Sequence, residues 1–91
     1  MLKEVLHLVA PLREGSSCAY LYGSQVDRPN PANDIDLLFI CEKDHKNFLI
    51  KQMQEIQAGS RYLFHPVFLS REAFERNPHF ASLIRNGVRL W

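Results

Sequence analysis

The sequence predicts an α/β fold, of the α+β kind, that forms a single domain over residues 1–91. Short apolar segments of strand length alternate with segments in which apolar residues recur at helical spacing. At 91 residues, the chain should bury somewhat more than ~60% of its unfolded surface, which is enough for one modest core. Both observations favour a small sheet covered by helices.

The helices are predicted from apolar periodicity and from the residues that end or cap each segment. Pro11 should end or bend the first helix, because proline lacks a backbone N–H. Ser70 is a suitable cap for a later helix, since its hydroxyl can accept a hydrogen bond from a free N–H in the first turn. Helical segments are expected at residues 1–12, 43–57, 71–76 and 79–85.

Strands are expected at residues 18–22, 34–41 and 61–70, with a last extended segment at residues 88–91. The segment 34–41 is apolar on both faces beyond Asp36, as in a central strand that is covered on two sides. Pro66 removes one donor from the third strand, which should therefore lie at a sheet edge or be broken there.

A Gly-Ser pair at the end of the first strand and an Asp-x-Asp pair at the start of the second carry the chemistry. Side chains alternate along a strand, so Asp34 and Asp36 should project from one face, about 6–7 Å apart along the chain, with Ile35 on the other. Two carboxylates on a rigid element suit Mg²⁺, which proteins usually hold through one or two carboxylates plus substrate phosphates. Gly23 would let a phosphate approach the backbone, and Ser24 could donate hydrogen bonds to it.

This pattern resembles the nucleotidyltransferase superfamily, the fold of DNA polymerase beta, and in particular its minimal bacterial and archaeal members. The resemblance implies a mixed, mostly antiparallel sheet of three or four strands with helices mainly on one face. It also implies that Asp34 and Asp36 are catalytic residues that hold Mg²⁺ or Mn²⁺. Gly23 and Ser24 would bind the phosphates of a nucleoside triphosphate, for which ATP is the first expectation.

The loop after the Gly-Ser pair departs from the family pattern. Minimal members continue Gly-Ser-x-Ala-Arg-Gly, whereas here Asp27 replaces the arginine and Arg28 replaces the last glycine. Arg28 is therefore either a nucleotide-binding residue that reaches a phosphate from a shifted position or a solvated loop residue.

The third catalytic carboxylate of the superfamily is also missing. The third predicted strand contains no acid, and Glu72 and Glu75 belong to the helix that follows. His65 stands close to the expected position, as either a catalytic base or an ordinary sheet histidine, although imidazole is a poor ligand for Mg²⁺.

Two functions are consistent with these features. The first is transfer of a nucleoside monophosphate from the triphosphate to an acceptor hydroxyl. The second is a catalytically weak or inactive binding module, such as the antitoxin of a two-gene toxin–antitoxin pair, because residues 61–80 resemble such domains and the chain is short. A helical partner protein or a second copy would then bind it, and Phe74, Phe80 and Trp91 would be either the contact or core residues.

Composition also limits the partners and the cellular location that are expected for this protein. The formal charge of +1, from 11 basic and 10 acidic residues, gives no electrostatic case for nucleic-acid binding. No signal-peptide pattern or membrane-spanning run is evident, so a cytoplasmic location without membrane contact is expected. Cys18 and Cys41 have no metal-ligand spacing and are expected to be inert, buried thiols.

Overall fold

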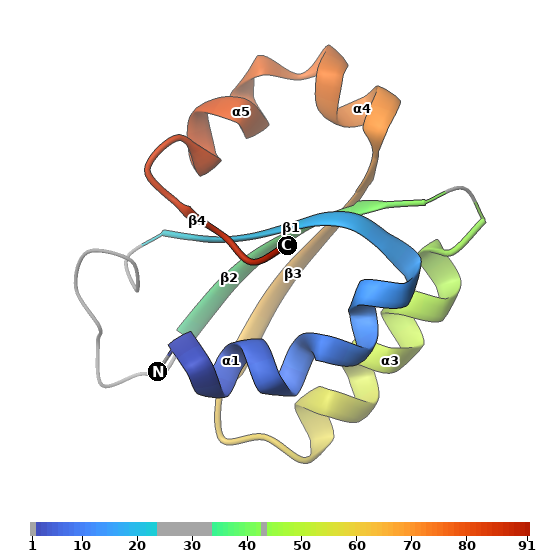
Figure 1. The fold of residues 1–91 in the computed structure, drawn as a ribbon, viewed down its shortest axis with the longest axis vertical. Coiled ribbons are helices and arrows are strands. Elements are labelled where there is room, and N and C mark those ends of the chain that lie inside the picture. The colour runs from blue at the N-terminus through green and yellow to red at the C-terminus, as the bar shows by residue number, and fades with distance from the viewer. Residues whose placement is uncertain (1, 24–33, 43) are drawn as a thin grey trace.

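The fold was taken from a computed structural model, which describes residues 2–23, 34–42 and 44–91 (Figure 1). The elements follow in the order α1 (Leu2–Val9), η1 (Ala10–Gly15), β1 (Ser16–Tyr22), β2 (Asp34–Cys41), α3 (Lys46–Ala58), β3 (Leu63–Ser70), α4 (Arg71–Arg76), α5 (Pro78–Ile84) and β4 (Val88–Arg89). Residue 1, residues 24–33 and residue 43 lie outside the described part of the chain.

The strands form one four-stranded mixed sheet in the order β3-β2-β1-β4. Strand β1 pairs antiparallel with both β2 and β4, whereas β2 and β3 are parallel. Parallel neighbours need a crossover connection, and α3 provides it between β2 and β3. Strand β3 lies at a sheet edge, as Pro66 predicted, and β2 is central. The predicted mixed, mostly antiparallel sheet is confirmed.

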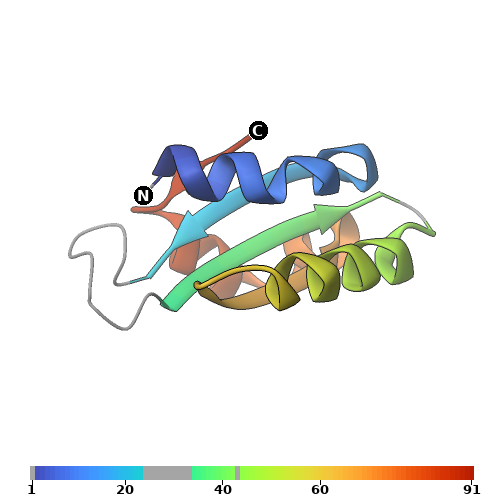
Figure 2. The same cartoon turned by 90° about the horizontal axis from the view of Figure 1, so that it is seen from below.

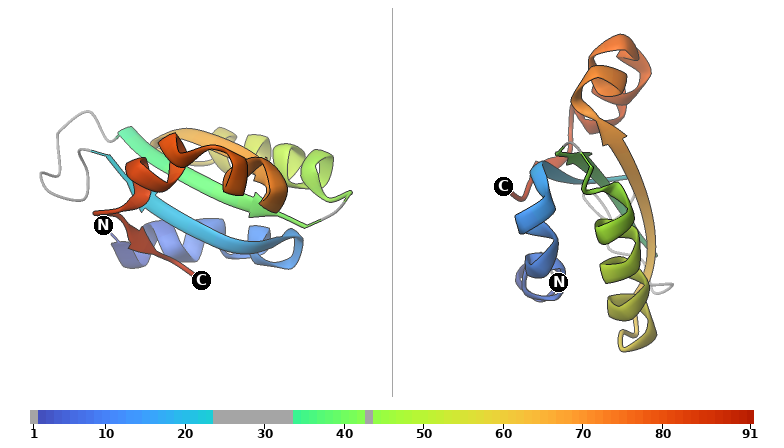
Figure 3. Two further views of the ribbon diagram at one scale, coloured as in Figure 1. Left: turned by 90° about the horizontal axis from the view of Figure 1, so that it is seen from above. Right: turned by 90° about the vertical axis from the view of Figure 1, so that its right-hand side faces the viewer.

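Helices cover both faces of this sheet, but unequally. Helices α1 and α3, together with η1, lie on one face, and the short helices α4 and α5 lie on the other (Figures 2 and 3). Helices were expected mainly on one face, and the apolar run of residues 34–41 indicated cover on both faces without showing which segment supplies the second layer. That layer forms because the chain crosses to the opposite face directly after β3.

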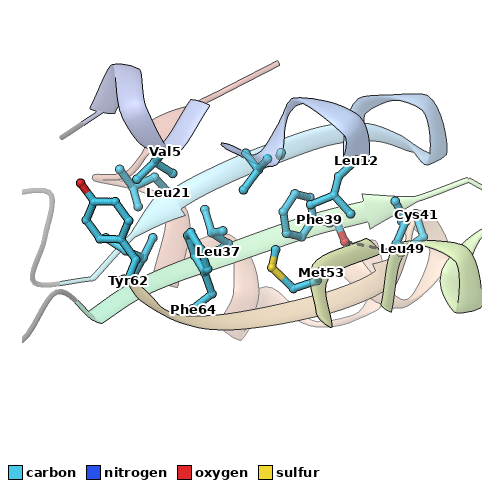
Figure 4. Close-up of a cluster of buried hydrophobic side chains, with 13 residues drawn as sticks. Val5, Leu12, Leu21, Leu37, Phe39, Cys41, Leu49, Met53, Tyr62 and Phe64 are labelled. Atoms are coloured by element: carbon cyan, nitrogen blue, oxygen red, sulfur yellow. Dashed lines mark hydrogen bonds between the residues drawn. The ribbon is translucent and has the colours of Figure 1, made fainter. Parts of the chain in front are cut away.

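The larger core lies between the sheet and the layer of α1, η1 and α3 (Figure 4). Its centre is Phe39 of β2, which is fully buried and stacks on Phe68 of β3 with ring centroids 5.3 Å apart. The other buried members come from every element of that layer and from the inward positions of the strands: Val5, Val9, Leu12, Ala19, Leu21, Ile35, Leu37, Cys41, Leu49, Met53, Tyr62 and Phe64. The smaller core, on the other face, has the buried residues Cys18, Leu38 and Ile40.

The two cysteines are both buried and free, but they lie on opposite faces of the sheet. Cys18 packs in the smaller core and Cys41 in the larger one, so the sheet separates their sulfur atoms. Burial raises the pKa of the Cys41 thiol, which keeps that thiol protonated and unreactive. The prediction of buried thiols is confirmed.

Several predicted boundaries differ from the structure: β1 begins at residue 16 instead of 18, and α3 at residue 46 instead of 43. The cause is clear in two further places. The first helix ends at Val9 and continues as the 3₁₀ turn η1, because Pro11 in its first turn cannot donate to the α-helical ladder. Strand β3 begins at Leu63 instead of residue 61, because the backbone N–H of Tyr62 donates to the Ser60 hydroxyl over 3.0 Å and the segment forms a bend. Among the described residues, no helix is long and apolar enough to cross a membrane.

Candidate functional site

The two aspartates lie at the amino end of β2, where β1 ends and β3 begins (Figure 1). Asp34 and Asp36 are partly exposed, whereas Ile35 between them is fully buried in the larger core. This alternation puts both carboxylates on the face of the sheet that α4 and α5 cover. The predicted placement of Asp34 and Asp36 on one face of a strand is confirmed.

Gly23 directly follows β1 and lies against the Asp36 carboxylate. Its φ of +85° is a left-handed conformation that side chains rarely adopt, and a Cβ placed there would overlap Asp36 Oδ2. Strand pairing produces this contact, because Tyr22, the preceding residue, is the register partner of Asp36. Only glycine therefore lets the chain leave β1 with a carboxylate at this distance from its backbone.

Asp34 lies against the opposite neighbour, strand β3. Its Oδ1 atom is 3.9 Å from Nε2 of His65, and the side chains of His65 and Asp34 are 52% and 42% exposed. The parallel register pairs Asp36 with His65 and Asp34 with Leu63, so all three polar side chains share one face. His65 thus borders the aspartates from the neighbouring strand β3.

Within their shared face, the two carboxylates consequently lean toward different neighbouring strands of the sheet. Asp36 lies over Gly23 on the β1 side, and Asp34 lies toward His65 on the β3 side. Among the described residues, no group of three or more histidine, cysteine, aspartate or glutamate side chains is arranged to hold a metal ion. The arrangement suits a cation that takes most of its ligands from a bound substrate, as Mg²⁺ does with triphosphates.

Hydrogen bonds at the start of β3 fix the position of His65. The Gln57 side chain, at the end of α3, accepts from the Phe64 backbone N–H over 2.7 Å and donates to the Tyr62 carbonyl over 2.6 Å. The Tyr62 hydroxyl donates to Glu4 of α1 over 2.6 Å, which lowers the pKa of the Glu4 carboxyl. These bonds anchor the segment just before His65 to helices α1 and α3.

Tyr22 belongs to this site, although sequence reasoning did not single it out. Burial raises the pKa of the Tyr22 phenol, and the nearby negative charge of Asp36 raises it further. The only signal in the sequence was its position next to Gly23, which is equally typical of a packed strand residue. Ser24 and Arg28, which were predicted to bind the nucleotide, lie outside the described residues.

A separate pocket of about 570 Å³ lies at the opposite end of β2. Two basic residues, Lys46 and Arg71, and two acidic residues, Glu42 and Asp44, line it with serine and cysteine side chains. These charges balance, so the pocket favours neither an anion nor a cation. The chemistry predicted from the sequence lies at the other end of the strand.

Comparison of the chain with protein-family models, curated proteins and solved structures gives no match. The resemblance to nucleotidyltransferases therefore depends on the residues of this chain alone: Gly23 and Ser24 after β1 and the two aspartates that open β2.

Proposed function

We propose that this chain binds a nucleoside triphosphate, ATP in the first instance, together with Mg²⁺ or Mn²⁺, and transfers its nucleoside monophosphate to an acceptor hydroxyl. One observation carries the proposal. Gly23, in a conformation that favours glycine, touches the carboxylate of Asp36, and Asp34 stands on the same face one strand repeat away. Two carboxylates held on one face of a strand are what a metal–triphosphate complex needs from the protein.

Each residue would act mainly by position. The absence of a side chain at Gly23 leaves room for the Asp36 carboxylate against the backbone, while the strand holds Asp34 and Asp36 rigidly. The cation would neutralise charge on the phosphates. Phosphoryl and nucleotidyl transfer depend chiefly on such positioning and charge neutralisation, so two carboxylates suffice to bind the substrate complex.

Activation of the acceptor hydroxyl is the weaker part of this arrangement. Strand β3 contributes His65 and no carboxylate to the shared face. We therefore expect turnover to be slow compared with an enzyme that has three acids, and binding to be the property to measure first.

The test is Mg²⁺-dependent ATP binding, measured by calorimetry on the wild type and on the double variant Asp34→Ala/Asp36→Ala. The matched control is Glu42→Ala/Asp44→Ala, which removes the same charge from the opposite end of β2. Binding should require Mg²⁺, disappear in the first variant and persist in the second. Equal loss in both variants would show a non-specific charge effect and contradict the proposal.

The lack of an acid on β3 favours one alternative, a binding module such as an antitoxin that binds a helical protein or a second copy. Phe74, Phe80 and Trp91, the apolar side chains considered for such a contact, are partly buried and pack against the two cores. A wild type that binds no ATP, but that forms a dimer or a defined complex in light scattering, would favour this alternative.

A further inference from the structure

The sheet ends in two edge strands of very different length. Strand β4 has two residues, whereas β3 has eight, and β3 contains no lysine, arginine, aspartate or glutamate. An apolar edge strand without charges is a template for pairing with another chain, because its outward N–H and C=O groups have no strand partner. The edge of β3 is therefore the place where this sheet would be expected to accept an additional strand.

The side chain of Gln57 already occupies the start of this edge. Its Nε2 donates to the Tyr62 carbonyl over 2.6 Å, and its Oε1 accepts from the Phe64 N–H over 2.7 Å. These two backbone groups flank Leu63. A residue of a neighbouring parallel strand bonds in the same way to the two residues that flank its partner. The carboxamide thus takes the place of one peptide unit of a fifth strand.

Pro66 extends this protection along the strand. Backbone N–H groups alternate between the two sides of a strand, and the Phe64 N–H points to Gln57, away from β2. The nitrogen of Pro66, two residues further on, faces the same outer side and has no hydrogen to donate. The first two outward positions of β3 therefore offer no donor to an added strand, and Phe68 is the next.

We infer that Gln57 and Pro66 guard the β3 edge, so that neither a second copy of this chain nor another protein binds by adding a strand there. The inference concerns association through the sheet and does not depend on nucleotide binding. It also limits the alternative function. A partner of this chain would bind through side chains on its helices or sheet faces and not by extending the sheet at β3.

The test compares the double variant Gln57→Met/Pro66→Ala with the wild type in sedimentation velocity over a range of concentrations. Methionine keeps the length of the Gln57 side chain but makes neither bond, and alanine restores an outward N–H. We expect the double variant to self-associate at a concentration at least about tenfold lower than the wild type, as two regained hydrogen bonds of ordinary strength imply.

Hydrogen exchange measures the guard directly. In the single variant Gln57→Met, the Phe64 amide should exchange at least about tenfold faster than in the wild type, because its hydrogen bond is lost. Gln57→Glu keeps an acceptor for Phe64 and loses the donor to Tyr62, so the Phe64 amide should stay protected in that variant.

The matched control is Gln54→Met, one turn earlier on α3. Gln54 lines the same groove of about 250 Å³ as Gln57, but within the described part of the chain it forms no hydrogen bond with β3. This variant should leave both self-association and Phe64 exchange unchanged. Circular dichroism of all variants checks that the fold persists.

Three results would overturn the inference. The first is equal self-association of the folded double variant and the wild type. The second is an unchanged exchange rate of the Phe64 amide in Gln57→Met, which decides the question if the double variant does not fold. The third is a wild type that associates through β3, seen as protection of the Phe68 amide at high concentration. None of these results depends on whether the chain binds ATP.

Discussion

The two faces of the sheet differ in how completely they are covered, and the candidate site lies on the less covered one. Helices α1 and α3, with η1, bury the inward side chains of β1 and β2 on one face, where Ile35, Leu37 and Phe39 are fully buried. The opposite face has only α4 and α5, in which no residue is buried. On that face, buried residues give way to the half-exposed Asp34 and Asp36.

The difference shows how one strand can bury apolar side chains on one face and still present carboxylates to solvent on the other. A carboxylate needs water or a partner, because burying an isolated charge is very costly. The core under α1, η1 and α3 cannot accept such groups. The layer of α4 and α5 is thinner and leaves the amino end of β2 open. Stability and binding should therefore respond separately to substitutions on the two faces.

The largest expected loss of stability is on the face of the sheet that α1 and α3 cover. Phe39→Ala should reduce the free energy of unfolding by about 3–5 kcal/mol, since it leaves a cavity beside Phe68 and Trp91. Phe80→Ala, on the thin face, should cost about 1–2 kcal/mol, because that ring is only partly buried. Equilibrium urea unfolding measures both.

Equal losses of unfolding free energy in these two variants would contradict the proposed difference between the two faces. Should Phe39→Ala not fold, Phe39→Leu keeps most of the volume and should still lose more stability than a conservative Phe80→Leu change.

An intermediate loss of stability is expected from a substitution at Gly23, directly after β1. Gly23→Ala should reduce stability by about 1–2 kcal/mol, because alanine is strained at positive φ, and should weaken ATP binding by displacing Asp36. The control is Gly59→Ala, where an added Cβ meets nothing within 4 Å and φ is −100°. Thermal unfolding and calorimetry on both variants test this. Unchanged ATP binding by Gly23→Ala would separate Gly23 from the site.

The smallest expected effect concerns the Tyr22 phenol. Asp36→Asn should lower the pKa of Tyr22, but this pKa should stay above its ordinary value, because burial is the larger cause of the rise. Absorbance titration of the phenolate, with Tyr22→Phe to identify the signal, measures the shift. The matched control is Glu42→Gln, which removes one charge beyond the far end of β2.

The raised pKa of Tyr22 also predicts the direction in which stability changes at alkaline pH. The folded chain keeps the Tyr22 proton to higher pH than the unfolded chain, in which the pKa is about 10. Stability should therefore fall as the pH rises from that value through the folded pKa, and Tyr22→Phe should reduce this fall. A fall of the same size in Tyr22→Phe would assign it to other groups.

Much of the local structure was predictable from the sequence. The bounds of β2 and α4 agree with the prediction, because a continuous apolar run and the Ser70 cap are local signals. The start of β3 and the end of α1 were predicted less well, since they depend on hydrogen bonds from Ser60 and on the 3₁₀ turn at Pro11. Cover on both faces of β2 was predicted, but not that α4 and α5 form the second layer, because periodicity does not reveal which face a helix covers.

The sequence by itself determined that Asp34 and Asp36 share a face, since alternation along a strand is a property of its backbone. Only the tertiary structure decided what each aspartate meets. Pairing with β1 brings Asp36 against Gly23, and parallel pairing with β3 brings Asp34 toward His65. The same pairing separates Cys18 from Cys41. The physical reason is that strand register joins residues far apart in the chain, and no local pattern specifies it.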